Sequence, residues 1–428
     1  MSRRPIGFPP TEISSLVNKV VVSQHAEEAS FLWTLRNRAV REPHYSLHDL
    51  SKLDERVEAH LDGLRNAADA GWNVCRSNVA DQGPAGIFPL AVLAFGSGDR
   101  ERMLEVLTAG CSTDETFSAL VSAMGWLEYD VISPWLLRLL EAKLSVHRAV
   151  GVRGTAIHRR DPGQVLTASI DDVDASLRAR ALRAAGELKR LDLIDHVARH
   201  LKDEDDSCRF WAAWSLILLG ESTHLSALSK YIERDDGTSV RALNVVLRAV
   251  NVDEGRRRVT ALVKEPRLLR LGVMGAGILG DPVSVPWLIK KAELPSLARL
   301  AGEAFTMITG ASLSYLDLDQ DAPPTAPDEG TPIEEILDLG YDSNLPWPSS
   351  DALTRWWNDN NQRFSSGSRY LNGATIDAAS LANTLTSGFQ RQREAAALEL
   401  AILETHRPFF EIRARGSRQQ QLLGVSTW

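Results

Sequence analysis

Cysteine is scarce in this chain of 428 residues, which has only Cys75, Cys111 and Cys208, far apart in the sequence. A disulfide framework needs an even set of cysteines at short spacings, so none is expected here. The chain has no Cys-x-x-Cys pair, so a zinc site built from cysteines is not expected either. The cysteine content is typical of a reducing compartment, and we predict that the protein is cytoplasmic.

Long apolar runs are also missing. No stretch of 18 apolar residues is present, so the sequence predicts no membrane span. The start, MSRRPIGFPP, has two arginines but no apolar segment behind them, so we expect no secretion signal. Alternating strand patterns are nearly absent, while hydrophobic residues make up 44% of the chain, enough for a large core. These features predict an all-α protein.

The chain lacks the basic excess of a general nucleic-acid binder, since its net charge is −8. The acidity is local: residues 316–342 hold nine Asp or Glu and no Lys or Arg. Because −8 minus −9 is +1, the rest of the chain is nearly neutral. We expect no nucleic-acid partner, and we interpret the acidic, proline-containing segment as a linker or an extended strap.

Metal-binding patterns are incomplete. His44 and His48 have the i, i+4 spacing of two ligands on a helix, but His60 lies about 18 Å further along a straight helix. The segment DLDQDAPPTAPD at 317–328 begins like a calcium loop, yet Ala322 stands where glycine is needed and Asp328 where glutamate is needed. We expect no metal.

Catalytic and cofactor motifs are missing as well. The chain has no Gly-x-Ser-x-Gly, no phosphate-binding loop of the Gly-Lys-Ser/Thr type and no Cys/His arrangement of a nucleophilic enzyme. The charged residues at 54–62 are typical of a solvated helix face. We therefore predict a non-enzymatic protein without catalytic residues and without a cofactor.

One motif does look like a nucleotide site. GAGILG at 275–280 has the spacing of a dinucleotide-binding fingerprint, which needs a buried strand before it. The preceding EPRLLRLGVM has charges at 267 and 270 after Pro266, which indicates a helix instead. Gly280 then occupies the position of a helix C-cap, and Asp281 with Pro282 opens the next helix. We predict that this motif ends a repeat and binds no nucleotide.

The same sequence pattern, an apolar run that ends in a small residue, recurs along the chain. Successive closing residues are 29, 29, 32, 34, 30, 30 and 30 positions apart. In the later units an arginine precedes the closing residue by eight to eleven positions: Arg178, Arg209, Arg241, Arg270 and Arg299. Two short helices of such a unit cannot bury their apolar faces alone, so the units must stack. The closing residues are Gly96, Gly125, Gly154, Gly186, Gly220, Val250, Gly280 and Gly310.

This pattern resembles HEAT-like repeats of the phycobilisome-lyase type, with DDSCRFWAAWSLILLG at 205–220 as the best match. The resemblance covers roughly residues 85–310 and implies a right-handed α-solenoid of about eight helix pairs. Two units depart from it, because Val250 replaces a glycine and the unit closing at Gly154 is degenerate.

The two ends of the chain carry a second resemblance. HYSLHDLSKLDERVEAHLDGLR near the start, with LPWPSSDALTRWWNDN, RYLNG and GFQRQREAAALELA near the end, is similar to a family of HEAT-like proteins of Gram-negative bacteria. Genes of that family commonly lie beside type VI secretion genes, including those of spike proteins and thiolase-like proteins. The resemblance implies a setting for the protein and no chemistry.

We therefore divide the chain into four parts. Residues 1–84 are predicted to form an N-terminal tail and helical cap, and 85–310 the HEAT-like repeats. Residues 311–349 are the acidic linker or strap, and 350–428 a small C-terminal helical unit. The apolar residues after Pro332 in the strap are predicted to dock it on the rest of the chain.

The C-terminal unit supplies the candidate site. Trp356 and Trp357 are adjacent on a predicted helix, so both cannot lie at the centre of one buried stripe. Core packing is the more common role of such a pair, and partner contact for one of them is the alternative, because tryptophan is enriched in binding hot spots. We predict that Trp356, Trp357, Arg369 and Tyr370 form or border a partner site.

Three functions remain open from the sequence. The first is a protein-binding scaffold, adaptor or chaperone, for which the second resemblance implies a type VI secretion effector, a spike or a thiolase-like protein as partner. The second is a HEAT-like lyase or another enzyme that handles a small ligand. The third is a nucleic-acid-binding HEAT protein, which the nearly neutral repeat region disfavours.

Overall fold

The computed structural model describes residues 18–234, 236–323 and 341–425. These residues divide into two compact units. The first unit comprises residues up to 40, 48–168 and 413 onward, and the second comprises residues 41–47 and 169–412. The predicted docking residues after Pro332 lie outside the described residues.

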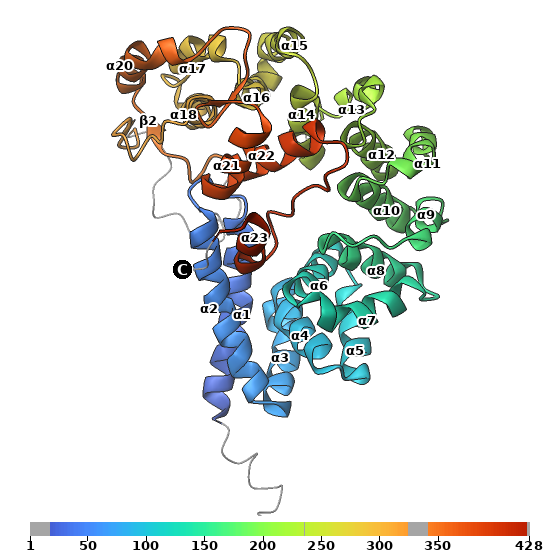
Figure 1. Ribbon diagram of the computed structural model, residues 1–428. Helices are drawn as coiled ribbons and strands as arrows, with labels where there is room; N and C mark the ends of the chain where they lie inside the picture. The colour runs from blue at the N-terminus through green and yellow to red at the C-terminus, as the bar shows by residue number, and fades with distance from the viewer. Residues whose placement is uncertain (1–17, 235, 324–340, 426–428) are drawn as a thin grey trace, which may run out of the picture. The chain divides into compact units, whose positions relative to one another are not determined.

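The first unit consists of helices, several of which pack on the next helix or on the next but one, as α3 does on α4 and α4 on α6 (Figure 1). They are α1 (Lys19–Ala39), α2 (Leu47–Asn66), α3 (Asp69–Gln82), α4 (Pro84–Ser97), α5 (Arg100–Gly110), α6 (Asp114–Trp126), α7 (Tyr129–Leu140), α8 (Ser145–Ile157), α9 (Gln164–Ile170, which continues into the second unit) and α23 (Gly416–Leu423).

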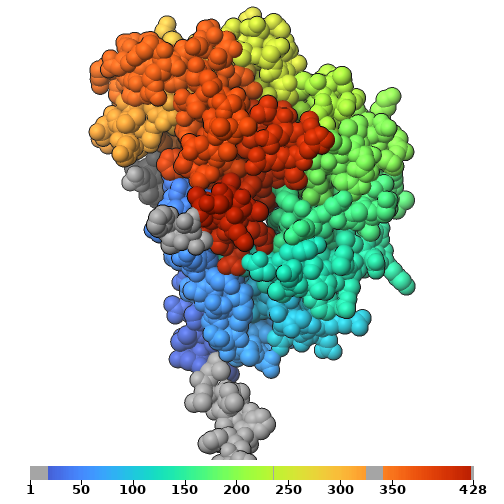
Figure 2. Space-filling view, viewed as in Figure 1, coloured from blue at the N-terminus to red at the C-terminus, as the bar shows by residue number. Residues whose placement is uncertain are grey.

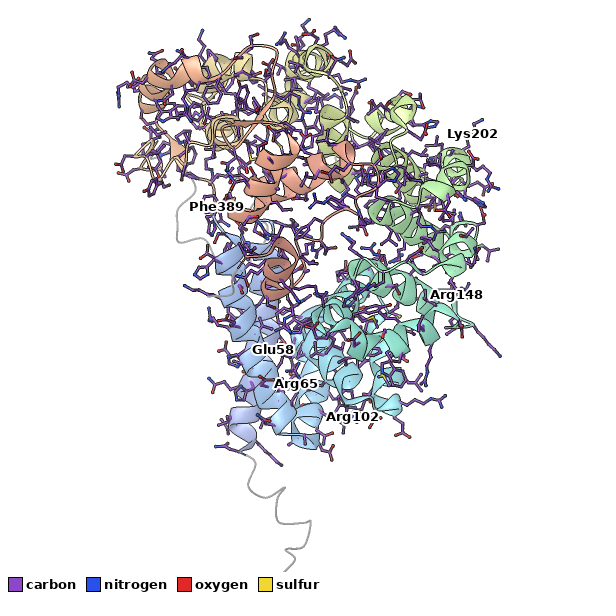
Figure 3. All side chains as sticks on the ribbon, viewed as in Figure 1. Glu58, Arg65, Arg102, Arg148, Lys202 and Phe389 are labelled. Atoms are coloured by element: carbon purple, nitrogen blue, oxygen red, sulfur yellow. The ribbon has the colours of Figure 1, made fainter. Side chains whose placement is uncertain are left out.

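Within this unit, buried polar contacts join residues 414–416 to α1 and α2. Arg36 and Asp54 form a buried ion pair of 2.8 Å between the two helices. The Arg36 guanidinium also donates to the carbonyl of Ala414, and the backbone N–H of Gly416 donates to the Asp54 carboxylate at 2.6 Å. On the more exposed part of α2, Glu58 and Arg65 lie on one face and pair at 2.7 Å (Figure 3).

The second unit is a longer series of helices, followed by a C-terminal segment that packs back on them (Figure 1). The helices are α10 (Ala175–Leu188), η2 (Leu191–Leu193), α11 (Ile194–Arg199), η3 (His200–Lys202), α12 (Asp206–Leu218), η4 (Ser222–His224), α13 (Leu225–Ser229), α14 (Gly237–Arg248), α15 (Val252–Lys264), η5 (Pro266–Leu268), α16 (Leu269–Leu279), η6 (Pro282–Ser284), α17 (Val285–Lys291), α18 (Pro295–Thr309), α20 (Ser350–Asn360), η7 (Asn361–Arg363), α21 (Ala378–Ser387) and α22 (Gln390–Leu403).

Two short antiparallel ladders complete the described part of this unit. Strand β1 (Asp319–Gln320) pairs with β2 (Trp347–Pro348), and β3 (Tyr370–Leu371) pairs with β4 (Ala374–Thr375). The first ladder joins the two described ends of the acidic segment. The predicted all-α class and HEAT-like solenoid are confirmed, since stacked helices form nearly all of the regular structure.

The acidic residues before three of the repeat arginines, Arg178, Arg209 and Arg241, are helix caps. Asp174, Asp205 and Asp236 each precede a helix and accept hydrogen bonds from its first free backbone N–H groups. Such a cap contributes about 1 kcal/mol. The arginine that follows closes the loop before the cap: Arg178 donates to the carbonyls of residues 172 and 173, and Arg209 to those of 203 and 204.

Arg148 makes the same contacts with the carbonyls of Ala142 and Lys143, and Figure 3 labels it on α8. Arg148 therefore opens a unit whose register differs from the one that the sequence predicts. Eleven residues later comes Arg159, with φ of 56°, where the later units have a left-handed residue. The register based on Gly154 is wrong, because Gly154 lies inside α8 and packs against Leu136.

The same correction applies to Gly186. It lies inside α10, where an added Cβ would meet Ser215, and the left-handed residue that ends the helix is Lys189, with φ of 59°. Gly220, Gly280 and Gly310 do end their helices with positive φ, as predicted. Gly96 and Gly125 also lie inside their helices, α4 and α6. A left-handed residue, which need not be glycine, therefore marks the helix end in several repeats but not in all.

Candidate partner-binding site

The C-terminal segment of the second unit runs across the ends of the repeat helices. The backbone N–H of Tyr370 donates to the carbonyl of Gly280 at 2.8 Å, and that of Asn372 to Met307 at 2.7 Å. Further along the segment, the N–H of Phe409 donates to the carbonyl of Glu187 at 2.9 Å. These bonds use carbonyl groups that a helix end leaves without partners, so the segment seals the ends of the repeats. The space-filling view shows the orange-red part of the second unit packed beside its green and yellow-green repeats (Figure 2).

Side chains complete the seal at the end of α12. The Lys189 ammonium group donates to the carbonyls of Leu218 and Ala401, which lie on α12 and α22. The methyl group of Thr405 lies against Gly220, 3.2 Å from where a Cβ would stand. The left-handed residue after α12, Gly220, turns the chain away and lets the segment approach, and Lys189 has the same conformation at the end of α10.

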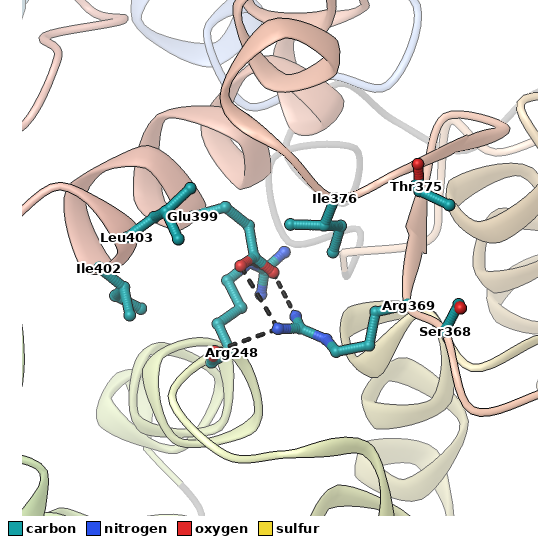
Figure 4. Close-up of a pocket in the computed structure, with 8 residues that line it drawn as sticks. All are labelled: Arg248, Ser368, Arg369, Thr375, Ile376, Glu399, Ile402 and Leu403. Carbon is teal, nitrogen blue, oxygen red and sulfur yellow. Dashed lines mark hydrogen bonds and ion pairs between the residues drawn. The ribbon is translucent and has the colours of Figure 1, made fainter.

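The end of α14 is different. Here Val250 takes the place of the glycine and does not have positive φ. A cavity of about 390 Å³ opens at this point, between the end of α14 and the C-terminal segment (Figure 4). Its lining residues are Arg248, Ser368, Arg369, Thr375, Ile376, Glu399, Ile402 and Leu403.

Two arginines and one glutamate dominate this pocket. The Arg369 guanidinium holds both carboxylate oxygens of Glu399, one of them at 3.4 Å, and also donates to the carbonyls of Leu279 at 2.9 Å and Arg248 at 3.1 Å. Arg369 therefore ties the ends of α14 and α16 to α22. A cation at helix C-termini is favourable because it complements their partial negative charge.

Arg248 is less well paired. Its side chain is 2% exposed, and its Nη1 donates to the side-chain and backbone oxygens of Asn244. Its Nε lies 3.5 Å from Glu399 Oε1 but makes no hydrogen bond. Burial lowers the pKa of Arg248, Glu399 acts in the opposite direction, and the nearby Arg369 lowers it further. The pocket thus contains the buried guanidinium group of Arg248, the partly buried one of Arg369 and one buried carboxylate.

Of the four predicted site residues, Arg369 lines the pocket and Tyr370 lies beside it, 5% exposed. Trp357 is connected to Tyr370 through the ring of Phe364, with centroid distances of 5.4 and 5.0 Å. Trp356 packs edge-to-face on Phe305 and is partly buried against the core. The structure therefore joins Trp357, Arg369 and Tyr370 in one region, and their contact with a partner stays a prediction.

Sequence reasoning missed Arg248 and Glu399. Both had a signal: Arg248 stands two residues before Val250, which breaks the glycine series, and Glu399 is the charged residue inside the apolar run AAALELAIL. Such a residue in a buried helix needs a partner of opposite charge. The partner could not be identified because Arg369 lies 30 residues away in sequence.

The motif GAGILG lies late in α16 and at its end, as predicted. An added Cβ at Gly277 would lie 2.7 Å from the Cα of Ala304, so this glycine allows α16 and α18 to pack closely. Within the described residues, no group of three or more His, Cys, Asp or Glu side chains could hold a metal ion. Nor is any helix in the described part of the chain long and apolar enough to cross a membrane.

Residues 163–248 match a family model described as HEAT repeats. The matched region contains α10, α12 and α14, and its last residue is Arg248 of the pocket. A comparison with curated proteins gave no match. The match and the stacked helices together support a HEAT-like repeat protein, a class that commonly mediates protein interactions.

Proposed function

We propose that this protein is a non-enzymatic adaptor or chaperone that binds a partner protein through the pocket at the end of α14. The observation that carries the proposal is the break in the sealed series of helix ends. At this break in the described repeats, charged groups, apolar side chains of α22 and Ile376 face an opening instead of the C-terminal backbone. A site with an apolar part and a few placed polar groups is suited to holding a projecting side chain or chain end.

The composition of the pocket favours binding over catalysis. Its only carboxylate, Glu399, has both oxygens engaged by Arg369, which leaves it poorly placed to take a proton from a substrate. Burial also raises the pKa of the Cys75 and Cys208 thiols to about 12. These thiols stay protonated at neutral pH and are weak nucleophiles.

We further propose that the partner belongs to the type VI secretion machinery, as an effector, a spike or a thiolase-like protein. The support is the resemblance of the chain ends to HEAT-like proteins encoded beside such genes. The residues that carry it, such as RYLNG at 369–373 and the run that contains Glu399, are those that close the helix ends and line the pocket. Arg369 thus lies both in a motif that carries the resemblance and in the lining of the pocket.

Affinity purification from the native host, followed by mass spectrometry, tests this proposal. Leu403 lines the pocket and is 57% exposed, whereas Leu294 of the same unit is 43% exposed and lies outside it. We expect the wild type to capture a secretion component, Leu403→Gln to lose it and Leu294→Gln to keep it. Equal capture by both variants would place the site elsewhere, and enrichment of an unrelated protein would overturn the secretion assignment.

A further inference from the structure

We propose that the pocket binds a carboxylate group of the partner, next to a short apolar side chain. This inference rests on the proposed function, because it names the chemistry by which that site recognises its partner. The carboxylate has two sources, the C-terminus of a chain or the side chain of an internal Asp or Glu. The two present the same planar anion to the pocket.

The first argument is charge. Arg248, Arg369 and Glu399 have side chains that are 2%, 13% and 6% exposed, so two positive groups share one negative group away from water. Buried ions are normally paired, since removing an ion from water costs several kcal/mol even after the surroundings relax. Glu394 also attracts Arg248, but it is exposed and its charge is screened by solvent. A further monoanion would complete the pairing.

The second argument is the under-used hydrogen-bonding capacity of Arg248. Its buried Nε has no hydrogen-bond partner among the described residues, although the guanidinium faces Glu399 and Arg369 across the pocket (Figure 4). A buried N–H without a partner is uncommon and costs about 1–3 kcal/mol. A ligand carboxylate that accepts from Arg369 frees an oxygen of Glu399 to accept from the Arg248 Nε, which lies 3.5 Å away.

The third argument concerns which anion fits. A phosphate group carries about −1.5 to −2 charges at neutral pH and would be repelled by Glu399, whereas one carboxylate balances the site. Ser368 and Thr375 place hydroxyl groups along one side of the pocket, and Ile402 and Leu403 provide an apolar wall on the other (Figure 4). A carboxylate with an adjacent aliphatic side chain matches this division.

Ligand-observed NMR titration with the full chain tests the inference. The probes are acetyl-Gly-Leu-Leu with a free C-terminus, the same peptide as its C-terminal amide, acetyl-Gly-Leu-Glu-Leu-amide and inorganic phosphate. We expect one of the two carboxylate peptides to bind about 10- to 100-fold more tightly than the amide without a carboxylate, the ratio for a charged hydrogen-bonding pair. Whichever peptide binds identifies the source. Tighter binding of phosphate, or equal binding of the amide, would overturn the inference.

Variants assign the binding to the pocket. Arg248→Met leaves one arginine paired with Glu399, so the variant should fold, keep its melting temperature within a few degrees and lose about tenfold in affinity. Arg267→Met, at an exposed arginine of the same unit, is the matched control and should bind like the wild type. Thr375→Val, at an exposed position, tests the site without touching a buried charge and should weaken binding about threefold. Unchanged affinity in both pocket variants would overturn the inference.

The peptide titration and the capture experiment test the two proposals independently, so one proposal can be overturned while the other stands. Peptide binding without capture of a secretion component would support the carboxylate site and overturn the proposed partner. Capture that depends on Leu403 with no carboxylate preference in the titration would do the reverse.

Discussion

The helix ends at Gly280 and at Arg248 belong to consecutive repeats, yet the C-terminal segment packs against them in different ways. At Gly280 the backbone of Tyr370 comes so close that an added Cβ would lie 2.2 Å from its carbonyl oxygen. At Arg248 no backbone closes the end, and two guanidinium groups, one carboxylate and an open cavity lie there instead. One end is sealed by main-chain hydrogen bonds and the other by an unevenly charged cluster of side chains.

The difference follows from one residue. A left-handed residue turns the chain out of the helix so that another backbone can approach the last carbonyl groups. Val250 is branched at Cβ and disfavours that conformation, so the chain leaves α14 by another route. The carbonyl of Arg248 is then satisfied by the Arg369 side chain, and the space is left as a pocket. A departure from the repeat pattern therefore marks a candidate site.

The strongest effect is expected at the charged end. Glu399→Gln leaves the buried guanidinium group of Arg248 and the partly buried one of Arg369 without a carboxylate, which should lower the free energy of unfolding by about 3–5 kcal/mol. Urea melts monitored by circular dichroism would measure it. Glu394→Gln, at an exposed position on the same helix, is the control and should change stability by about 0.5 kcal/mol or less. Equal effects would mean that Glu399 does not neutralise the pocket.

A second test addresses a sealed end that relies on apolar packing. Leu218, 0% exposed, is the last residue of α12, and Leu218→Ala should cost about 2–5 kcal/mol through lost contacts and a cavity. Leu294→Ala, at a residue 43% exposed, should cost about 1 kcal/mol or less. Denaturant melts of both variants measure the difference, and a loss below about 1 kcal/mol for Leu218→Ala would contradict the observed packing.

The sequence predicted the fold better than the site. The repeat length, the helix end at Gly280 and the all-α class followed from patterns within about 30 residues, because an amphipathic helix and its cap are local features. The register failed at Gly154 and Gly186, since Arg159 and Lys189 adopt the left-handed conformation without being glycine. Arg248 and Glu399 were missed because their pairing depends on how the C-terminal segment crosses the repeats, which no local pattern encodes.

Gly280→Ala is expected to cause the next largest loss of stability. It tests directly whether the C-terminal segment covers this helix end. The left-handed backbone, with φ of 75°, costs an alanine about 1–2 kcal/mol, and the close approach of Tyr370 adds to this. We expect a total loss of about 2–4 kcal/mol in thermal or denaturant melts. Gly98 has φ of 72° at the end of α4 with nothing within 4 Å of an added Cβ, so Gly98→Ala should show the backbone cost alone. Equal losses at the two glycines would mean that the segment does not seal this end.

The smallest expected effect is a dependence on pH at the end closed by Lys189. Burial lowers the pKa of Lys189 from 10.5 to about 8 in the folded protein. Between pH 8 and 10.5 the unfolded chain binds a proton at this residue that the folded chain has released, so stability should rise with pH in that window. The contribution should be about 1 kcal/mol per pH unit, and it adds to whatever the other groups contribute.

Comparison with Lys189→Met isolates this contribution. The difference in unfolding free energy between the wild type and the variant should grow in favour of the wild type from pH 8 to pH 10, because only the wild type has this lysine to deprotonate. Exposed Lys230, changed to Met, should give a profile parallel to the wild type. Urea melts at half-unit pH steps would measure all three proteins. If the Lys189→Met profile also ran parallel, the ammonium group would be as well solvated in the folded protein as in the unfolded chain, and the seal over Leu218 and Ala401 would be open to water.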